Sequence, residues 1–220
     1  MPSLLLSKSV IEVAMHTILY IRQIYPAELF DRRRLFDIPV FQCIEPSIND
    51  YVSKAIKAVG EEIIEDNVSK VIINIHKSDK PLEKFIFSFD RPKDSGSPIL
   101  DPERIPLEVL QRQMRAMLLK LNTIDAQLLP LMASSNLSFS FMMELREENV
   151  HGFPEDSFDS DVSSPDVSLG KTRGKENQPE VCTTYDPALV HIIRAGAFNV
   201  SLYVQESHAK ELSAQTRHGD

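Results

Sequence analysis

The residues best suited to catalysis are spread along this chain without a shared motif. Its 220 residues include six histidines and two cysteines. His16 follows Glu12 by four positions, which places both side chains on one face of a helix. Such a pair could transfer a proton, but it is more often a local helix contact than a catalytic dyad. Cys43 and Cys182 lie far apart and lack the short spacing of a zinc or redox motif. The sequence therefore predicts no metal site and no disulfide.

Motifs for the common covalent and nucleotide-dependent reactions are also missing from the sequence. It contains no nucleophile elbow, phosphate-binding loop, zinc-protease motif or dinucleotide fingerprint. Only seven glycines occur, and they do not cluster as a phosphate cradle requires. We therefore expect a non-catalytic protein that needs no cofactor.

The charge balance argues against nucleic acid as a direct partner. The chain carries 32 acidic and 24 basic residues, a formal net charge of −8 at pH 7. A protein that grips phosphates needs a basic face. The one dense basic run, Arg32 to Arg34, is typical of a solvated loop. We also expect no membrane association, because the apolar helix predicted near the N-terminus contains Glu12, His16 and Arg22. Two isolated cysteines and no secretory signal indicate a reducing compartment.

Hydrophobic periodicity predicts three long helices. The first covers residues 10–25, with Ser9 opening a capping box and Pro26 ending the helix. It is apolar around most of its circumference, so other elements must surround it. The second begins at Ser47, and the third runs from Asp101 to Pro130.

Strand patterns fill most of the remaining chain up to residue 205. A short edge strand is expected at 38–44, a hairpin at 68–77 and 82–90, and single strands at 137–145 and 198–205. Residues 186–190 are expected to be irregular. Residues 147–166 contain seven acids and no Lys or Arg, so 147–180 is predicted to be a disordered acidic insertion. The result is an α+β fold with three helices packed on an antiparallel sheet.

The last predicted strand is separated from the core by this insertion, and that arrangement leaves two interpretations open. A tethered C-terminal hairpin can close over a peptide that pairs with a sheet edge. The same pattern also describes an ordinary edge hairpin with a solvated loop. Periodicity alone favours the second interpretation.

Several ordered motifs resemble the HORMA domain. The likeness runs from about residue 4 to residue 205, outside the acidic insertion, and rests on residues 18–20, 25–26, 39–40, 46–51, 81–87, 115–116, 125–126, 186–189 and 202–204. It implies one domain over 4–206, with a core at 4–146, the insertion at 147–180, safety-belt strands at 181–206 and a flexible tail at 207–220. In such domains the C-terminal safety belt closes over a partner peptide.

Within the family the likeness is greatest to the accessory subunits of translesion DNA polymerase zeta. This implies a non-catalytic nuclear adaptor in DNA damage tolerance. It would trap a proline-containing peptide of the polymerase's catalytic subunit and bridge to a deoxycytidyl transferase. The matching positions assign Tyr51 and Pro187 to peptide binding, and Leu189, Ser201 and Tyr203 to the second-partner surface. Ser201 departs from the family pattern, in which a longer amide stands at that position.

The resemblance also implies that Arg115, Lys120 and Ala126 form a face for homo- or heterodimerisation with another HORMA domain. Two other functions remain open at this point. A spindle-checkpoint HORMA protein would trap a checkpoint-activator peptide by the same mechanics. A scaffold whose C-terminal strands do not close over a peptide would correspond to the ordinary edge hairpin.

Overall fold

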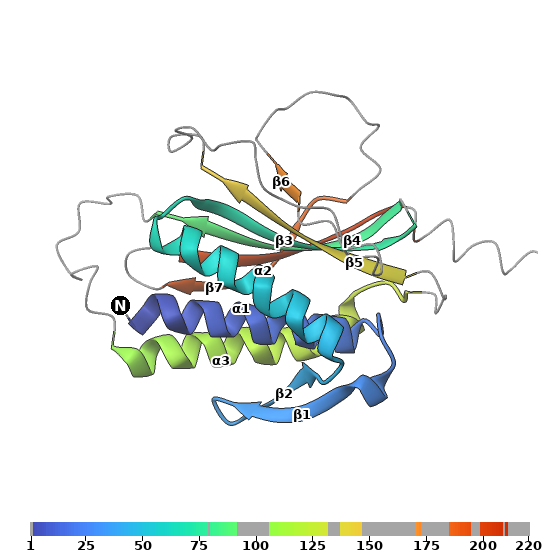
Figure 1. Ribbon diagram of the computed structural model, residues 1–220, viewed down its shortest axis with the longest axis horizontal. Helices are drawn as coiled ribbons and strands as arrows, with labels where there is room; N and C mark the ends of the chain where they lie inside the picture. Colours follow the sequence, from blue (N-terminus) through green and yellow to red (C-terminus); the bar gives the residue numbers. More distant parts are fainter. Residues whose placement is uncertain are drawn as a thin grey trace, which may run out of the picture.

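The protein forms a layer of three helices against one face of a six-stranded sheet (Figure 1). The computed structural model describes residues 2–78, 80–91, 106–131, 137–146, 170–172, 185–194, 199–208 and 210. This arrangement confirms the predicted α+β class with helices packed on a mostly antiparallel sheet.

The central strands of the sheet are a hairpin, β3 (Val68–Lys77) and β4 (Lys80–Asp90). The strand order is β6-β5-β3-β4-β8-β7. On one side β5 (Leu137–Leu145) pairs antiparallel with β3, as predicted. On the other side β8 (Asn199–Glu206) pairs antiparallel with β4, and β7 (Ala188–Arg194) pairs with β8. The C-terminal strands therefore lie at the edge opposite β5.

The helices are α1 (Pro2–Ile21), α2 (Pro46–Ile64) and α3 (Leu107–Thr123), which continues into the 3-10 helix η2 (Ile124–Gln127). Helix α1 lies between α2 and α3 in the layer (Figure 1). Ala14, Met15 and Ile18 of α1 have no exposed surface. This central position explains why α1 is apolar on nearly every side.

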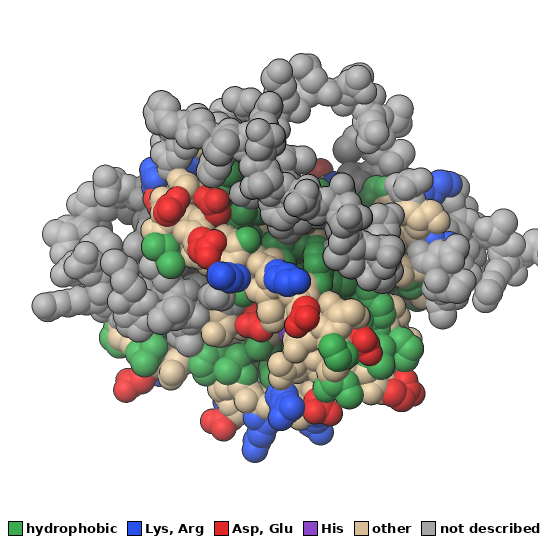
Figure 2. Space-filling model, in the orientation of Figure 1, with side chains coloured by type: hydrophobic (Ala, Val, Ile, Leu, Met, Phe, Trp, Pro, Cys, Tyr) green, Lys and Arg blue, Asp and Glu red, His purple; other side chains and the backbone are tan. Residues whose placement is uncertain are grey.

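A second, two-stranded sheet lies beyond the helices. After the short helix η1 (Ala27–Leu29), β1 (Phe30–Leu35) and β2 (Ile38–Cys43) form an antiparallel hairpin. The prediction that Arg32 to Arg34 lie in a loop was wrong, because these residues form most of β1. Their side chains are exposed, and basic side chains gather at the lower edge of the molecule over this hairpin (Figure 2).

Several predicted boundaries differ from the structure. Helix α1 begins at Pro2 instead of near Ser9, since proline fits a first helical turn. Ser47 does not cap α2, which begins at Pro46 after Glu45. The predicted start of the third helix at Asp101 lies outside the described residues. Residues 188–190 of the segment predicted to be irregular belong to β7. There, backbone pairing with β8 outweighs the mixed composition of the segment.

Two predictions for the C-terminal part need correction. The predicted insertion 147–180 lies outside the described residues except for β6 (Gly170–Thr172), which pairs in parallel with β5 because that edge offers unpaired backbone groups. The predicted flexible tail begins too early. The backbone N–H of Ser207 donates to the Leu82 carbonyl at 2.9 Å, and Lys210 is only 5% exposed.

His16 is buried in the helical layer. It is 2% exposed, and its Nδ1 accepts a hydrogen bond from the Cys43 backbone N–H at 3.4 Å. Burial lowers the pKa of His16 from 6.5 to about 4. The folded chain therefore holds this imidazole neutral where the unfolded chain would protonate it.

Lowering the pH from 7.5 to 5 should reduce the free energy of unfolding by about 2 kcal/mol through His16, because the unfolded state gains the proton first. The contribution is fully present above pH 6.5 and declines as the pH falls toward 4. Urea unfolding at several pH values would measure the slope. A His16→Gln variant should have a shallower slope, and an unchanged slope would refute the assignment.

Candidate partner-binding site

The two edges of the large sheet are used differently. Strand β8 pairs with β4 along its length, from Glu83 opposite Glu206 to Asp90 opposite Asn199. On the outer side of β5, β6 pairs only with the stretch from Met142 to Glu144. Within the described residues, the outer edge of β5 from Leu137 to Phe141 has no partner strand. An unpaired strand edge presents backbone donors and acceptors to an extended peptide.

Between β5 and β7 the chain passes from one edge of the sheet to the opposite edge. Residue Leu145 ends β5 near one edge, and Ala188 begins β7 at the opposite edge. Four strand spacings separate β5 from β7, a distance of about 19 Å. The end of β5 and the start of β7 therefore lie on opposite sides of the central β3–β4 pair.

Tyr51 lies on α2 and packs toward the free edge. Its ring meets that of Phe139 on β5 edge-on, with 5.5 Å between centroids, and the Tyr25 ring also meets Phe139 edge-on, with 6.1 Å between centroids. Burial raises the pKa of Tyr51 to about 12, with a smaller opposing effect from the Phe141 backbone. The ring is half-buried, so it is positioned beside β5 as an aromatic wall.

Pro187, the other residue assigned to peptide binding, lies elsewhere. It is exposed and immediately precedes β7, whereas Tyr51 packs on β5. Strands β3, β4 and β8 separate these two positions. The structure therefore does not bring Tyr51 and Pro187 together into one pocket.

The residues assigned to the second-partner surface lie on the C-terminal hairpin formed by β7 and β8. Leu189 and Tyr203 are opposite each other across the two strands, and Ile86 on β4 is the next neighbour of Tyr203. Leu189 is 52% exposed and Tyr203 is half-buried. Residues opposite each other in an antiparallel pair place their side chains on the same face of the sheet, so Leu189 and Tyr203 are neighbours on one face. Ser201 follows the same alternation but is 5% exposed, so it offers little surface.

The residues assigned to dimerisation are all exposed on α3 and η2. Arg115 donates to the Phe36 carbonyl at 2.8 Å, and Lys120 donates to the Val190 carbonyl at 3.0 Å. Phe36 has a positive φ of 50° in the β1–β2 turn. Arg115 and Lys120 thus anchor neighbouring elements as well as facing solvent, while Ala126 presents only its small side chain.

A set of contacts between α3 and the edge of β7 was not predicted. The Gln113 side chain accepts from the Arg194 backbone N–H at 2.7 Å and donates to the Arg194 carbonyl at 3.3 Å. His191 Nε2 lies 3.2 Å from the Gln113 carbonyl oxygen. Together with Lys120, Gln113 therefore hydrogen-bonds three backbone groups of β7, the Val190 carbonyl and the N–H and carbonyl of Arg194. The sequence carried no signal for them, since a glutamine on a helix face is usually solvated.

A pocket of about 390 Å³ lies between the end of α3 and the start of β7. Its walls include Lys120 and Leu128 on one side and Tyr185, Ala188 and Leu189 on the other. It therefore joins the exposed face of α3 to the Leu189 side of the C-terminal hairpin. Within the described residues no group of three His, Cys, Asp or Glu side chains could hold a metal ion. No helix among the same residues is long and apolar enough to cross a membrane.

Comparison with known proteins places this architecture in a family. Residues 3–153 match the HORMA domain model, so the chain belongs to the HORMA domain family. It is 32% identical over 120 residues to a human protein named mitotic spindle assembly checkpoint protein MAD2B, covering 54% of each chain. It is also 32% identical over 79 residues to the DNA polymerase zeta processivity subunit of Schizosaccharomyces pombe, covering 36% of this chain and 37% of that protein. The first match spans about half the length of that relative.

Solved structures support the same fold at lower sequence identity. A chain in the crystal structure of a mitotic checkpoint complex is similar over 94% of this chain and 99% of its own length, with a TM-score of 0.69 and 17% identity. The Caenorhabditis elegans protein HTP-2 bound to a HIM-3 closure motif is similar over 91% of this chain and 88% of its own, with a TM-score of 0.63 and 13% identity. At these identities the likeness establishes the HORMA fold.

Replacing Gln113 with alanine should loosen the edge of β7, because two hydrogen bonds to Arg194 are lost. We expect a loss of about 1 kcal/mol of unfolding free energy and faster hydrogen exchange at the Arg194 amide. Gln111→Ala on the same helix is the matched control and should leave that amide unchanged. Equal exchange in both variants and the wild type would show that Gln113 does not hold the strand.

Proposed function

We propose that this chain is the non-catalytic adaptor subunit of a translesion DNA polymerase zeta. In this role it traps a proline-containing peptide of the catalytic subunit against the free edge of β5, beneath the connection that leads to the C-terminal hairpin. The proposal places the protein in the nucleus and requires neither a cofactor nor direct contact with nucleic acid.

The placement of the C-terminal hairpin carries this proposal. With β8 paired to β4, the hairpin leaves the outer edge of β5 unpaired from Leu137 to Phe141 within the described residues. An added peptide strand there would gain main-chain hydrogen bonds, and alternate side chains would face the helical layer. Tyr51 stands on that side of β5. The name of the fission-yeast relative supports the polymerase as the source of the peptide.

A second partner would contact the opposite side of the molecule. We assign Leu189 and Tyr203 to binding the deoxycytidyl transferase, because they form an apolar area on the β7–β8 hairpin, well separated from β5. Ser201 would contribute little because it is buried. Arg115, Lys120 and Ala126 would form the face toward a second HORMA domain. The β5 edge is separate from these two surfaces, which meet at the pocket lined by Lys120 and Leu189, so a captured peptide would leave both accessible.

A spindle-checkpoint role is the second candidate. The human relative is named as a checkpoint protein, and a solved checkpoint complex contains a chain of the same fold. In that case the same β5 edge would receive a checkpoint-activator peptide. The two candidates differ in which peptide is retained, and not in how it is held.

Co-purification of the full chain with each peptide distinguishes the two candidates. We expect retention of the proline-containing segment of the polymerase catalytic subunit and loss of that retention in Tyr51→Ala, which removes the aromatic wall beside β5. Tyr51→Phe is the matched control, since it keeps the ring and removes only the hydroxyl. Retention of the checkpoint peptide alone would favour the second candidate, and retention of neither would contradict peptide capture.

Leu189→Ala and Tyr203→Ala should spare peptide capture yet weaken binding of the deoxycytidyl transferase. Each change removes part of the apolar area on the C-terminal hairpin, with an expected cost of about 1–3 kcal/mol in binding free energy. Titration of the transferase onto the preformed complex would measure it. Equal loss of both interactions in the Tyr51, Leu189 and Tyr203 variants would contradict the two-surface assignment.

A further inference from the structure

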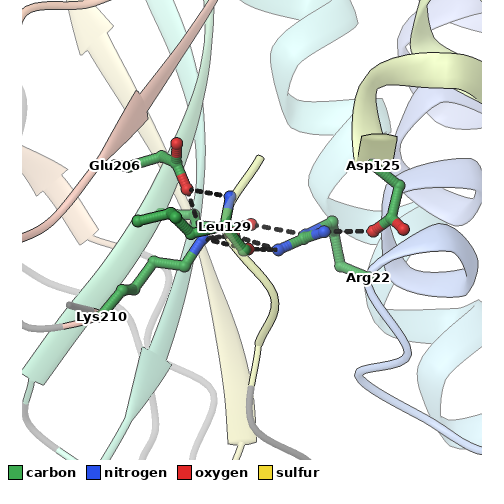
Figure 3. Close-up of polar contacts among 6 residues, drawn as sticks. Arg22, Asp125, Leu129, Glu206 and Lys210 are labelled. Carbon is green, nitrogen blue, oxygen red and sulfur yellow. Dashed lines mark hydrogen bonds and ion pairs between the residues drawn. The ribbon is translucent and has the colours of Figure 1, made fainter. Parts of the chain in front are cut away.

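A cluster of charged side chains lies where the end of α1, the start of β4 and the chain following β8 meet (Figure 3). Three of its members are almost fully buried: Arg22 is 3% exposed, Glu83 is 1% exposed and Lys210 is 5% exposed. Asp125 of η2 and Glu206 of β8 complete it. Neither the peptide site nor the second-partner surface uses these residues.

Glu83 is the centre of the cluster. Its carboxylate accepts from Arg22 Nε at 2.9 Å and from Lys210 Nζ at 2.5 Å, and it forms a second contact with Arg22 Nη2. Arg22 also pairs with Asp125 and donates to the Leu129 carbonyl at 2.8 Å. The buried negative charge is therefore balanced by two cations from different parts of the chain.

Lys210 connects the C-terminal end to this centre. In addition to Glu83, its ammonium group donates to the Leu129 carbonyl at 2.7 Å and pairs with Glu206, four residues earlier. The Glu206 carboxylate in turn accepts from the Leu129 backbone N–H at 3.0 Å. All three donors of the ammonium group thus have a partner in the cluster.

The cluster divides into a fixed part and a C-terminal part. Arg22, Glu83 and Leu129 lie just after α1, in β4 and in the segment after η2, all of which precede the C-terminal hairpin in the chain. Glu206 and Lys210 belong to the end of that hairpin. If Lys210 leaves, the buried Glu83 carboxylate keeps Arg22 but loses its second cation, and Lys210 loses its contacts with Glu83 and the Leu129 carbonyl. Weakening the compensation of a buried charge is unfavourable, so undocking of Lys210 carries a penalty.

We propose that Lys210 and its socket of Glu83, Glu206 and the Leu129 carbonyl form a latch for the β7–β8 hairpin. The latch holds the end of β8 against β4, and its release is the first step when the hairpin separates from the sheet. The backbone N–H of Tyr185, just before β7, donates to the Glu206 carbonyl at 2.9 Å, so the same point secures both ends of the hairpin. If the proposed function holds, the latch sets how long a trapped peptide stays bound.

Hydrogen exchange on the full chain without any partner peptide tests the latch directly. In Lys210→Met, which keeps an unbranched apolar stem and removes the ammonium group, we expect amides of β7 and β8 to exchange roughly tenfold faster or more. Amides in the centre of β3 should keep their wild-type rates, because the hairpin opens locally. Lys57→Met, at an exposed position on α2, is the matched control and should change neither region.

Two results would overturn the proposal. Unchanged exchange in β7 and β8 would show that Lys210 does not hold the hairpin, and equal acceleration in β3 and β8 would show a general loss of stability. If Lys210→Met does not fold, Glu206→Gln provides the same comparison with a milder change. Because no peptide is added, failure of the latch is distinguishable from failure of peptide capture.

Discussion

The backbone ladder between β4 and β8 is the constraint on which this structure depends. It places the C-terminal hairpin on one side of the central β3–β4 pair and leaves β5 on the other. Its register also decides which side chains face the helices. Val200, Leu202 and Val204 are buried against the core, whereas Tyr203 faces outward. A slip of one residue would exchange these two faces and bury Tyr203 in place of Leu202.

The two edges of the sheet differ in how their backbone groups are satisfied. At the β7 edge, Gln113 and Lys120 supply side-chain hydrogen bonds from α3, and the charged cluster around Glu83 secures the end of the hairpin. Covering of this kind blocks the edge from further strand addition. The β5 edge has only the short β6 beside it within the described residues. Within the described residues the β5 edge is therefore the more open of the two, which is why we propose it as the site of peptide addition.

Much of the fold could be predicted from the sequence, because hydrophobic periodicity reports burial. The all-round apolar character of the first helix indicated a central position, and α1 does lie between the other two helices. The alternation of Phe85, Phe87 and Phe89 indicated one buried face of β4. Extending that alternation by one step places Glu83 on the same buried face, a signal that could have identified the charged cluster.

Other features depend on contacts that periodicity does not encode. Strand β1 was missed because three consecutive arginines resemble a loop, and only the register with β2 reveals a strand. Lys210 resembled a residue of a polar tail, because its partners are distant in the sequence. Glu83 is 127 positions away, and the Leu129 carbonyl lies in the segment after η2. The separation of Tyr51 from Pro187 follows from strand order, which a single sequence does not specify. The site assignments rested on the family resemblance, and the structure adds where each residue lies.

We propose that a partner peptide adds to the free edge of β5. Hydrogen exchange of the full chain, with and without the proline-containing polymerase segment, measures it most directly. Binding should slow exchange at outward-facing β5 amides between Leu137 and Phe141. Slower exchange confined to α3 or the β7–β8 hairpin, with β5 unchanged, would contradict it.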